Sequence, residues 1–468
     1  MENCIVWDNS VLGSHFQVVS TSANAKFFNC YLPPLTADNL GVFTDCVFTN
    51  TAPNYRNAAA GDYRLTAGSP CVDRGRAGSA IPVGSRDLDG HARLVGAQVD
   101  IGAFEFDPGE ALACDIDAPL LEGVGTLDVT LAAVVAGTAP GSTPTFAWTT
   151  NDVAAGTSAT LPLSLANPGY YTVGLTVNDG SATASVVRTN LLYVVPPVIY
   201  VAAGNAGAVF PYATPATAAA AIQTAVVAAR DGCVVEVGPG SYGLNASIML
   251  NKPIELRTLA EPGQTRLYKT ISDVVMLQLG HSRARFHGFD FDGGRPNVVQ
   301  IWGNGGVVSN CVIRNGYYTS GSGVGVRALA GLVTHCDIRN NNSDREGGGI
   351  GAYLEGTAVI ENCIIMDNDN TASAPLANWA GTAASFRYTC TTPDLGGTGN
   401  RTDDPRYVDP AAGDFRLQAG SPCINTGLTL EGMTAETDLS GGRRVWQRFV
   451  DLGALEYVPP AGSVLFLR

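Results

Sequence analysis

The sequence predicts an all-β protein that consists mainly of a β-solenoid, together with a separate small β-sandwich. Only 15% of the 468 residues are charged, and 55 glycines provide for many turns. Cys311, Cys336 and Cys363 stand in one local frame at intervals of 25 and 27 residues, and a fixed period of this size indicates stacked repeats. Residues 107–196 instead contain short alternating strands around one tryptophan, a pattern typical of a sandwich. A chain of this length is expected to form about two to four domains.

The charge balance excludes several classes of partner. The chain has 28 basic and 42 acidic residues and a net charge of −14, with no basic cluster that would neutralise phosphates, so we expect no nucleic-acid partner. No apolar run reaches the roughly 18 residues that span a bilayer, so we expect no transmembrane segment. The start Met1-Glu2-Asn3-Cys4 lacks the charged and apolar regions of a signal peptide.

Each repeat of the solenoid is predicted to point alternate side chains inward and outward. Alternation puts Cys311 and Ile313 on one face and Val312 and Arg314 on the other, and the next repeat shows the same pattern. The eleven cysteines include no C-x-x-C pair, which argues against zinc ribbons and redox motifs. We interpret most of them as small buried hydrophobes and leave a few disulfides open, because an oxidising compartment would permit them.

Two asparagines mark a predicted corner of the solenoid. Asn315 and Asn340 follow the strands at equivalent places in successive repeats. Stacked asparagines at a corner satisfy the backbone groups of turns. We therefore predict a structural role for them and not a ligand-binding one.

A single helix is predicted at residues 215–231, just before the solenoid. Thr214 can act as its N-cap, Pro215 fits its first turn, and Gly232 ends it. Such a helix would cover the unpaired edge and the open apolar core of the first repeat.

Parts of the first hundred residues return near the end of the chain. Two segments recur at offsets of 352 and 351 residues: Asp62-Tyr63-Arg64-Leu65-Thr66-Ala67-Gly68-Ser69-Pro70-Cys71 as Asp414-Phe415-Arg416-Leu417-Gln418-Ala419-Gly420-Ser421-Pro422-Cys423, and Asp100-Ile101-Gly102-Ala103-Phe104-Glu105-Phe106 as Asp451-Leu452-Gly453-Ala454-Leu455-Glu456-Tyr457. Residues 1–106 are therefore predicted to duplicate the end of the solenoid at 362–457. Because few repeats precede this first copy, we expect its edge to be exposed or covered by another part of the chain, and Met1 to lie inside a longer parent protein.

The segment 107–196 resembles a known family. Its motifs look like those of a PKD-type Ig-like domain: Phe146-Ala147-Trp148, Asn167-Pro168-Gly169-Tyr170-Tyr171-Thr172-Val173 and Thr176-Val177-Asn178-Asp179-Gly180. The family usually has Trp-Asp-Phe-Gly-Asp-Gly where this chain has Trp148-Thr149-Thr150-Asn151-Asp152.

The rest of the chain carries a second resemblance. The stretch from Ile199-Tyr200-Val201 to Val458 resembles bacterial right-handed parallel β-helix proteins of the pectate-lyase-like superfamily. Its end is similar to the closing module often called choice-of-anchor Q, through Asp404-Pro405-Arg406-Tyr407-Val408-Asp409, Gly420-Ser421-Pro422-Cys423 and Asp451-Leu452-Gly453-Ala454-Leu455-Glu456. This resemblance implies a secreted or surface-displayed bacterial protein whose anchor follows the module.

These observations predict a chain of four segments. They are the closing end of a truncated, partial second β-helix at 1–106, a PKD-type Ig-like β-sandwich at 107–196, a right-handed parallel β-helix at 197–458 with a cap helix at about 215–231 and a closing module at about 401–458, and a tail at 459–468.

The sequence contains no motif for metal or phosphate chemistry. The five histidines (15, 91, 281, 287 and 335) lack metal-ligand spacing, and neither a G-x-S-x-G elbow nor a phosphate loop is present. Asp87-Leu88-Asp89-Gly90 could suggest calcium, but its counterpart Asp438-Leu439-Ser440-Gly441 loses the second carboxylate. We interpret both as turns and expect no cofactor, since no specific motif supports Ca²⁺.

Two functions from different classes remain open. The missing motifs favour a non-catalytic, extracellular or cell-surface protein for display, adhesion or carbohydrate binding, a monomer with a polysaccharide or cell-surface glycan as partner. The alternative is a polysaccharide lyase or glycoside hydrolase that acts on a polysaccharide, an acidic one included, at the β-helix face. Carboxylates and a basic group that converge in a groove on one β-helix face would favour the enzyme.

One outward cluster is the candidate binding site. Alignment of the repeats predicts two neighbouring columns, Asp292-Arg314-Arg339 and Asp290-Val312-Asp337, with rungs about 4.8 Å apart. The plain interpretation is a solvated ladder of ion pairs, each worth roughly 0–1 kcal/mol. Because two stacked arginines need a carboxylate or an acidic ligand beside them, we also predict a weak site for an acidic or neutral glycan, built from Asp290, Asp292, Arg314, Asp337 and Arg339.

Overall fold

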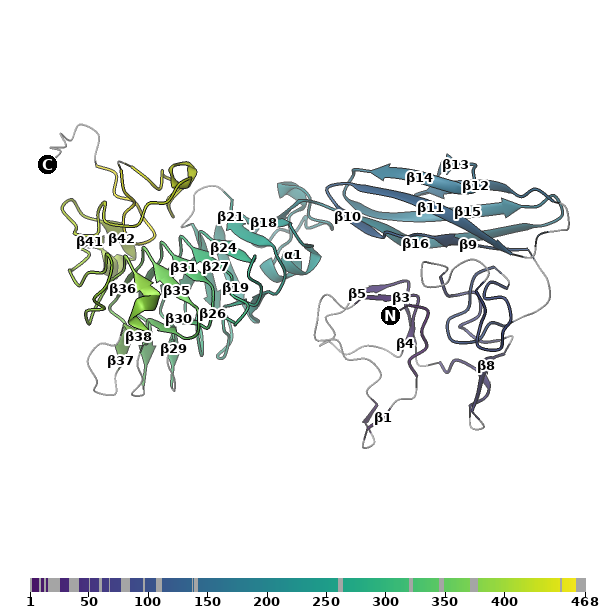
Figure 1. Cartoon of the computed structure of the whole chain (residues 1–468), viewed down its shortest axis with the longest axis horizontal. Helices are drawn as coiled ribbons and strands as arrows, with labels where there is room; N and C mark the ends of the chain where they lie inside the picture. Colours follow the sequence, from purple (N-terminus) through teal and green to yellow (C-terminus); the bar gives the residue numbers. More distant parts are fainter. Residues whose placement is uncertain are drawn as a thin grey trace. The chain divides into compact units, whose positions relative to one another are not determined.

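The regular secondary structure of the described residues is almost entirely β-strand, with very little helix, as predicted (Figure 1). The computed structural model describes residues 2–7, 10–11, 14–15, 26–32, 42–49, 51–58, 61–66, 68–76, 85–95, 97–106, 112–136, 138, 142–259, 264–319, 323–344, 349–370, 378–446 and 448–459. Its contacts divide the chain into two compact units, Met1–Val195 and Pro196–Arg468. The predicted division into four segments stays a prediction.

The second unit is a parallel β-solenoid of about six turns, in which each turn adds one strand to each of three sheets. The first sheet consists of β17 (Val198–Val201), β18 (Val234–Val237), β21 (Glu255–Thr258), β24 (Arg285–His287), β27 (Val307–Ser309), β31 (Leu332–Thr334), β35 (Val359–Glu361) and β39 (Phe386–Arg387). The second consists of β19 (Gly240–Leu244), β22 (Thr265–Lys269), β25 (Asp290–Asp292), β28 (Val312–Arg314), β32 (Asp337–Arg339), β36 (Ile364–Met366) and β40 (Cys390–Thr391). The third consists of β20 (Ile248–Leu250), β23 (Leu277–Leu279), β26 (Val299–Ile301), β30 (Val326–Ala328), β34 (Ala352–Leu354) and β38 (Trp379–Gly381), and a short ladder joins β29 (Tyr317–Tyr318), β33 (Asn342–Ser343) and β37 (Asp369–Asn370).

A one-residue corner joins the first sheet to the second and explains the recurring Asn-Cys motif. Asn310, His335 and Asn362 occupy this corner with φ of 52°, 51° and 54°, a left-handed conformation that asparagine tolerates better than most residues. The cysteine that follows each of them is fully buried in the solenoid core. All eleven cysteines of the chain are free thiols in the structure.

The buried asparagine ladder lies beside the predicted one. Asn315 and Asn340 do occupy a left-handed corner, with φ of 58° and 52°, but their side chains are exposed. The stacked, fully buried amides are Asn341, Asn368 and Asn378. Nδ2 of Asn341 donates to Oδ1 of Asn368 at 2.9 Å, and Nδ2 of Asn368 donates to Oδ1 of Asn378 at 3.0 Å. The prediction of stacked structural asparagines therefore holds for the corner, and it was wrong about which side chains stack.

The cap at the start of the solenoid is shorter than the predicted helix. Thr214 caps a 3₁₀ turn at Pro215–Thr217 (η2), as expected, but the α-helix α1 covers only Ile222–Ala228. The residues between them are extended because Ala219 forms a parallel bridge with Val201 of β17. Helix α1 packs against β17, β18 and β20, so it does cover the first turns of the solenoid (Figure 1).

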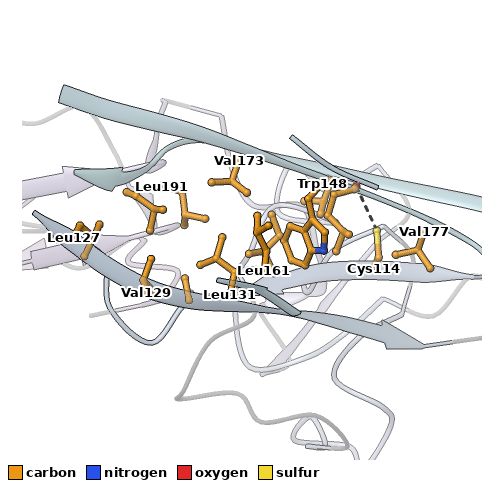
Figure 2. Close-up of a cluster of buried hydrophobic side chains, with 14 of the residues drawn as sticks. Cys114, Leu127, Val129, Leu131, Trp148, Leu161, Val173, Val177 and Leu191 are labelled. Carbon is orange, nitrogen blue, oxygen red and sulfur yellow. Dashed lines mark hydrogen bonds between the residues drawn. The ribbon is translucent and has the colours of Figure 1, made fainter. Parts of the chain in front are cut away.

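The first unit contains two β-sheets that enclose a common core. One has the strand order β10 (Glu122–Val124), β16 (Thr183–Val195), β15 (Gly169–Asn178), β12 (Thr145–Thr150) and β13 (Val153–Gly156), and the other β14 (Thr160–Leu165), β11 (Leu127–Ala136) and β9 (Ala113–Asp117). Figure 2 shows Trp148 between the sheets among aliphatic side chains such as Leu131 and Leu161. The indole Nε1 of Trp148 donates to the carbonyl of Ser158 at 2.8 Å, so its one polar group is satisfied.

The residues before this sandwich form short parallel ladders. Strand β3 (Lys26–Phe28) pairs with β5 (Val42–Thr44), β4 (Tyr31–Leu32) pairs with β6 (Val47–Phe48), and β1 (Ser10–Val11) and β2 (Ser14–His15) form a hairpin. Asn3, Asn29 and Asp45 repeat the left-handed corner of the second unit, with φ of 49°, 46° and 50°. These ladders therefore have the local geometry of solenoid rungs.

Each unit contains one closing segment, which we define as residues 51–106 and residues 401–458. The first contains the antiparallel pair β7 (Tyr55–Asn57) and β8 (Asp62–Leu65). The second contains the pair β41 (Tyr407–Asp409) and β42 (Asp414–Leu417), joined by the 3₁₀ turn η4 (Pro410–Ala412), and the 3₁₀ turn η5 (Met433–Ala435) follows the pair. The serine of each recurring Gly-Ser-Pro-Cys motif donates to a proline carbonyl, from Ser69 to Pro53 at 2.5 Å and from Ser421 to Pro405 at 2.6 Å.

Candidate functional site

The second closing segment covers part of the outer face of the second sheet. Tyr407 and Phe415 pack on an outward apolar strip that contains Val312, Ile364 and Met366. This packing decides which members of the predicted cluster reach solvent: the segment covers β32 and β36 and reaches Val312 of β28, while Arg314 of β28 stays partly exposed.

The strand register places the predicted columns as expected. Asp292 pairs with Arg314, and Arg314 with Arg339. The neighbouring column runs from Asp290 through Val312 to Asp337. All five side chains of the predicted site therefore project from the same face of the second sheet.

The expectation that Asp337 and Arg339 face solvent was wrong. Asp337 is only 1% exposed, and it accepts hydrogen bonds from the hydroxyl of Tyr407 and from the N–H of Ala454, the latter at 2.8 Å. Burial raises the pKa of Asp337 above its usual value. Arg339 is 4% exposed, lies 4.7 and 4.8 Å from the rings of Tyr407 and Phe415, and pairs with Asp367. Both side chains hold the closing segment on the sheet.

The other three predicted residues form a partly exposed ion-pair network, which we call the salt-bridge ladder and define as Arg266, Asp290, Asp292 and Arg314. Arg314 donates twice to Asp290, at 2.9 and 2.8 Å, and lies 3.6 Å from Asp292. Asp292 also pairs with Arg266. The hydrogen bond to Asp290 raises the pKa of Arg314, so its guanidinium stays charged.

A groove lies over the first sheet, beside the second closing segment. It has a volume of about 510 Å³. Its floor is made of two outward columns, in which Arg285, Val307 and Leu332 follow Glu255, and Ser309, Thr334 and Glu361 follow His287. Its wall contains Leu430, Met433, Glu436 and Thr437, and its edge the corner residues Asn310 and His335.

Carboxylates and basic groups do converge in this groove. Glu361 accepts from Arg387 at 2.7 Å, and Glu255 from Arg257 at 3.3 Å. Glu436 forms no ion pair within the described part of the chain. Burial lowers the pKa of His287, which is therefore a neutral imidazole near pH 7.

The groove cannot be recognised from the sequence. Its floor comes from residues 255–361 and its wall from residues 430–437, and no local pattern links these segments. The one available signal was the outward column itself, where His287, Ser309 and Thr334 occupy equivalent places in successive repeats.

The Asp-x-Asp turn at Asp87 contains side chains that can bind a metal ion. Ligand atoms of Asp87, Asp89 and His91 lie within 4.8 Å of one another. However, Asp87 accepts hydrogen bonds from the N–H groups of Asp89 and His91, at 3.0 and 2.8 Å. The carboxylate of Asp89 accepts hydrogen bonds from the guanidinium of Arg64. In the second copy Asp438 makes the equivalent bonds to backbone N–H groups without the other two ligands. The geometry is that of a turn stabilised by an aspartate.

Comparison with known proteins supports the fold assignment. Residues 276–382 match the family model of the right handed beta helix region. A crystal structure of pectate lyase Pel9A aligns with 55% of this chain and 96% of that chain, at 12% sequence identity and a TM-score of 0.20. No curated protein matches the sequence. The parallel sheets and the family model together define a right-handed parallel β-helix protein.

None of the helices in the described part of the chain has the length and apolar content that a membrane-spanning helix needs.

Proposed function

We propose that this protein binds carbohydrate through its β-helix and does not cleave it. The observation that carries the proposal is the state of the carboxylates in the groove: Glu255 and Glu361 are engaged by arginines, and Glu436 alone has no ion pair among the described residues. Glycoside hydrolysis requires two carboxyl groups that can exchange a proton and activate water or attack the sugar. A groove with one such group can hold a sugar without hydrolysing it.

Lyase chemistry has even less support from the side chains of the β-helix. An elimination needs a basic group that can lose its proton, and hydrogen bonds to Glu236 and Asp290 raise the pKa of Arg257 and Arg314. The group of possible metal ligands found among the described residues, Asp87 with its two neighbours, lies in the other unit. These facts support binding over elimination.

The finer parts of the proposal rest on sequence resemblance. We assign the sandwich of the first unit to the PKD type and both closing segments to the choice-of-anchor Q type. A bacterial protein with such modules is secreted or displayed on the cell surface, where a polysaccharide ligand would be available. The salt-bridge ladder is a second place for glycan contact within this proposal.

A glycoside hydrolase is the second candidate, because three glutamates face one groove. A panel of neutral and acidic polysaccharides distinguishes the two functions, with binding measured on a glycan array and cleavage by the release of reducing ends or unsaturated products. The proposal predicts binding without products. Products that disappear in the Glu436→Gln variant would overturn it.

A further inference from the structure

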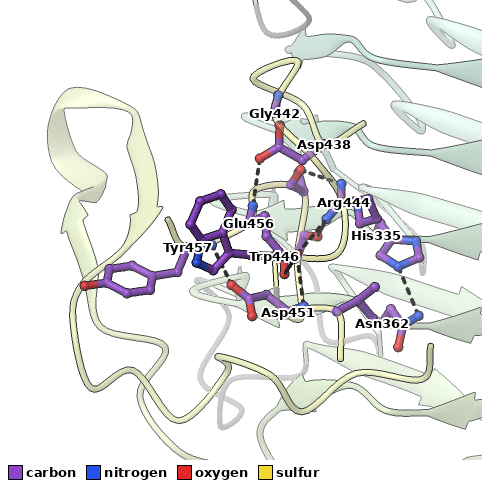
Figure 3. Close-up of polar contacts among 12 residues, drawn as sticks. His335, Asn362, Asp438, Gly442, Arg444, Trp446, Asp451, Glu456 and Tyr457 are labelled. Carbon is purple, nitrogen blue, oxygen red and sulfur yellow. Dashed lines mark hydrogen bonds and ion pairs between the residues drawn. The ribbon is translucent and has the colours of Figure 1, made fainter. Parts of the chain in front are cut away.

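The orientation of the Asn362 amide determines which nitrogen of His335 carries a hydrogen, at the edge of the groove. The backbone N–H of Leu428 donates to Oδ1 of Asn362 at 2.7 Å, and Nδ2 of Asn362 donates to the carbonyl of Leu428 at 3.0 Å. The amide cannot be reversed without loss of both bonds. Its Nδ2 therefore also acts as the donor toward Nε2 of His335, 3.1 Å away (Figure 3).

This contact determines the tautomer of His335. Burial lowers the pKa of His335 well below its usual value, so the ring is neutral. A neutral imidazole whose Nε2 accepts must carry its hydrogen on Nδ1. Nδ1 lies 2.9 Å from the hydroxyl oxygen of Thr334 and donates to it. The hydroxyl hydrogen of Thr334 is then left without an acceptor among the described residues, on the floor of the groove.

Two more unused polar groups stand in the same column. Ser309 is the strand partner of Thr334, and His287 is the strand partner of Ser309. Neither side chain makes a hydrogen bond within the described part of the chain. Three hydrogen-bonding groups therefore follow one another at the rung spacing of about 4.8 Å.

An apolar strip runs beside this polar column. Val307 and Leu332 occupy the neighbouring outward column, and Leu430 and Met433 line the opposite wall. A sugar ring presents hydroxyl groups at its edge and C–H groups on its faces. It therefore matches a surface on which a polar column lies beside an apolar strip. The volume of about 510 Å³ falls in the range of small-ligand sites.

The charges of the groove select against an acidic sugar. Glu255, Glu361 and Glu436 line it together with one arginine, Arg285. Two of these glutamates are already balanced by arginines, but their carboxylates would still repel the carboxylate of a uronic acid at short range. A neutral sugar avoids this repulsion.

We propose that the groove is a binding site for a short stretch of a neutral polysaccharide, whose hydroxyl groups bond to His287, Ser309 and Thr334 while a ring face rests on Val307 and Leu332. This inference rests on the proposed function and narrows it to uncharged sugars and to the first sheet of the β-helix.

The test is a calorimetric titration of the full chain with neutral gluco-, manno- and xylo-oligosaccharides and, separately, with oligogalacturonides. Ser309→Ala and Thr334→Val should each weaken neutral binding about three- to tenfold, the effect of one lost hydrogen bond. Thr334→Ser should restore it. Ser241→Ala is the matched control, since Ser241 is an exposed strand hydroxyl outside the groove, on the second sheet.

Each other outcome contradicts a distinct claim. Neutral binding that is unchanged in the groove variants and lost in Arg314→Ala would overturn the groove site and leave the proposed function standing. Tighter binding of oligogalacturonides would overturn the neutral class. Absence of binding to any sugar would overturn the proposed function itself. Thermal unfolding of Ser309→Ala and Thr334→Val identifies a variant that has lost its fold, and Ser309→Ala removes no side-chain hydrogen bond to any residue that the structure describes.

Discussion

The two closing segments share a carboxylate frame, which we define as the buried aspartate of each copy, Asp100 or Asp451, with the backbone N–H groups that donate to it. The residues on the outer surface of the two segments differ. In the first, Asp100 accepts from the N–H groups of Asp73 and Phe106, at 2.7 and 2.6 Å. In the second, Asp451 accepts from those of Asn425 and Tyr457, both at 2.6 Å. The same backbone groups are thus held by the same carboxylate in both copies.

The outer surfaces of the two copies have diverged. In the first unit Leu94 and Val99 are buried against Ala113 and Val134 of the sandwich. Their counterparts in the second unit are Val445, which is half-buried, and Val450, which is fully buried. The difference lies at Trp446 and Phe449, which are 44% and 42% exposed and stand in the place of the half-buried Val95 and Gln98. The carboxylate frame is therefore the same whether or not a sandwich packs on the segment. The residues on the outer surface differ according to what they pack against.

One buried arginine of the sandwich, Arg188, also holds the first closing segment, and its loss should have the largest effect. Arg188 pairs with Asp115 at 2.9 Å and donates to Gln98 at 2.8 Å and to the carbonyl of Gly75. Arg188→Ala removes the guanidinium that is paired with the fully buried Asp115, together with the hydrogen bonds to Gln98 and Gly75, and should lower the free energy of unfolding of the first unit by about 3–5 kcal/mol.

Denaturant unfolding of the full chain measures this effect. The control is Arg416→Ala in the second unit, because the pair of Arg416 with Asp414 is exposed and should contribute about 0–1 kcal/mol. A loss below about 1 kcal/mol for Arg188→Ala would show that the joint does not stabilise the unit.

The shared frame should make both segments sensitive to alkaline pH. Burial, with the charge of the neighbouring aspartate, raises the pKa of Glu105 to about 9 and that of Glu456 to about 8, against 4.5 for a free glutamate. The folded state therefore holds a proton that the unfolded state releases above pH 4.5, so stability is greatest below that pH and falls until the pH passes 8 to 9.

Each glutamate should account for several kcal/mol of this fall, because one pKa unit corresponds to about 1.4 kcal/mol. Unfolding at a series of pH values should show a flatter profile for Glu105→Gln and for Glu456→Gln. A wild-type profile that rises between pH 5 and pH 9 would contradict the raised pKa values.

Truncation of an equivalent apolar side chain should destabilise the first closing segment more than the second. Leu94→Ala removes side-chain contacts with the sandwich and should cost about 2–3 kcal/mol. Val445, which stands in the equivalent place, is only half-buried, so Val445→Ala should cost about 1 kcal/mol or less. Equal losses in the two thermal unfolding curves would mean that the sandwich does not protect the first copy.

The smallest expected difference in stability is that between the alanine variants of the two arginines in the predicted column. Arg339→Ala removes a guanidinium that packs between Tyr407 and Phe415 and should cost about 1–2 kcal/mol. Arg314→Ala, one rung away and partly exposed, should cost about 0–1 kcal/mol. Thermal unfolding that ranks Arg314 above Arg339 would contradict the placement of the closing segment on this sheet.

Strand alternation was sufficient to predict the solenoid and its columns, because side chains of a strand alternate strictly between two faces. It could not predict that Asp337 and Arg339 are buried, since the segment that covers them lies 68 or more residues further along the chain at Tyr407. The one sequence feature that indicated this burial was the pair of apolar residues at outward positions, Val312 and Ile364, because such residues indicate a covered face.

Two errors of detail had local causes. The corner residue Asn340 projects outward in its left-handed conformation, so the ladder begins one residue later, at Asn341. The cap helix is interrupted because Ala219 pairs with Val201, a tertiary contact that helix propensity does not anticipate. The groove was missed because it exists only between two segments that are distant in sequence.

The measurement that tests the account most directly is a crystal structure of the full chain soaked with a neutral tetrasaccharide. The account predicts an intact sugar in the groove, with one hydroxyl within hydrogen-bond distance of the Thr334 hydroxyl and a ring face on Val307 and Leu332. A cleaved sugar, or one bound only at the salt-bridge ladder, would contradict it.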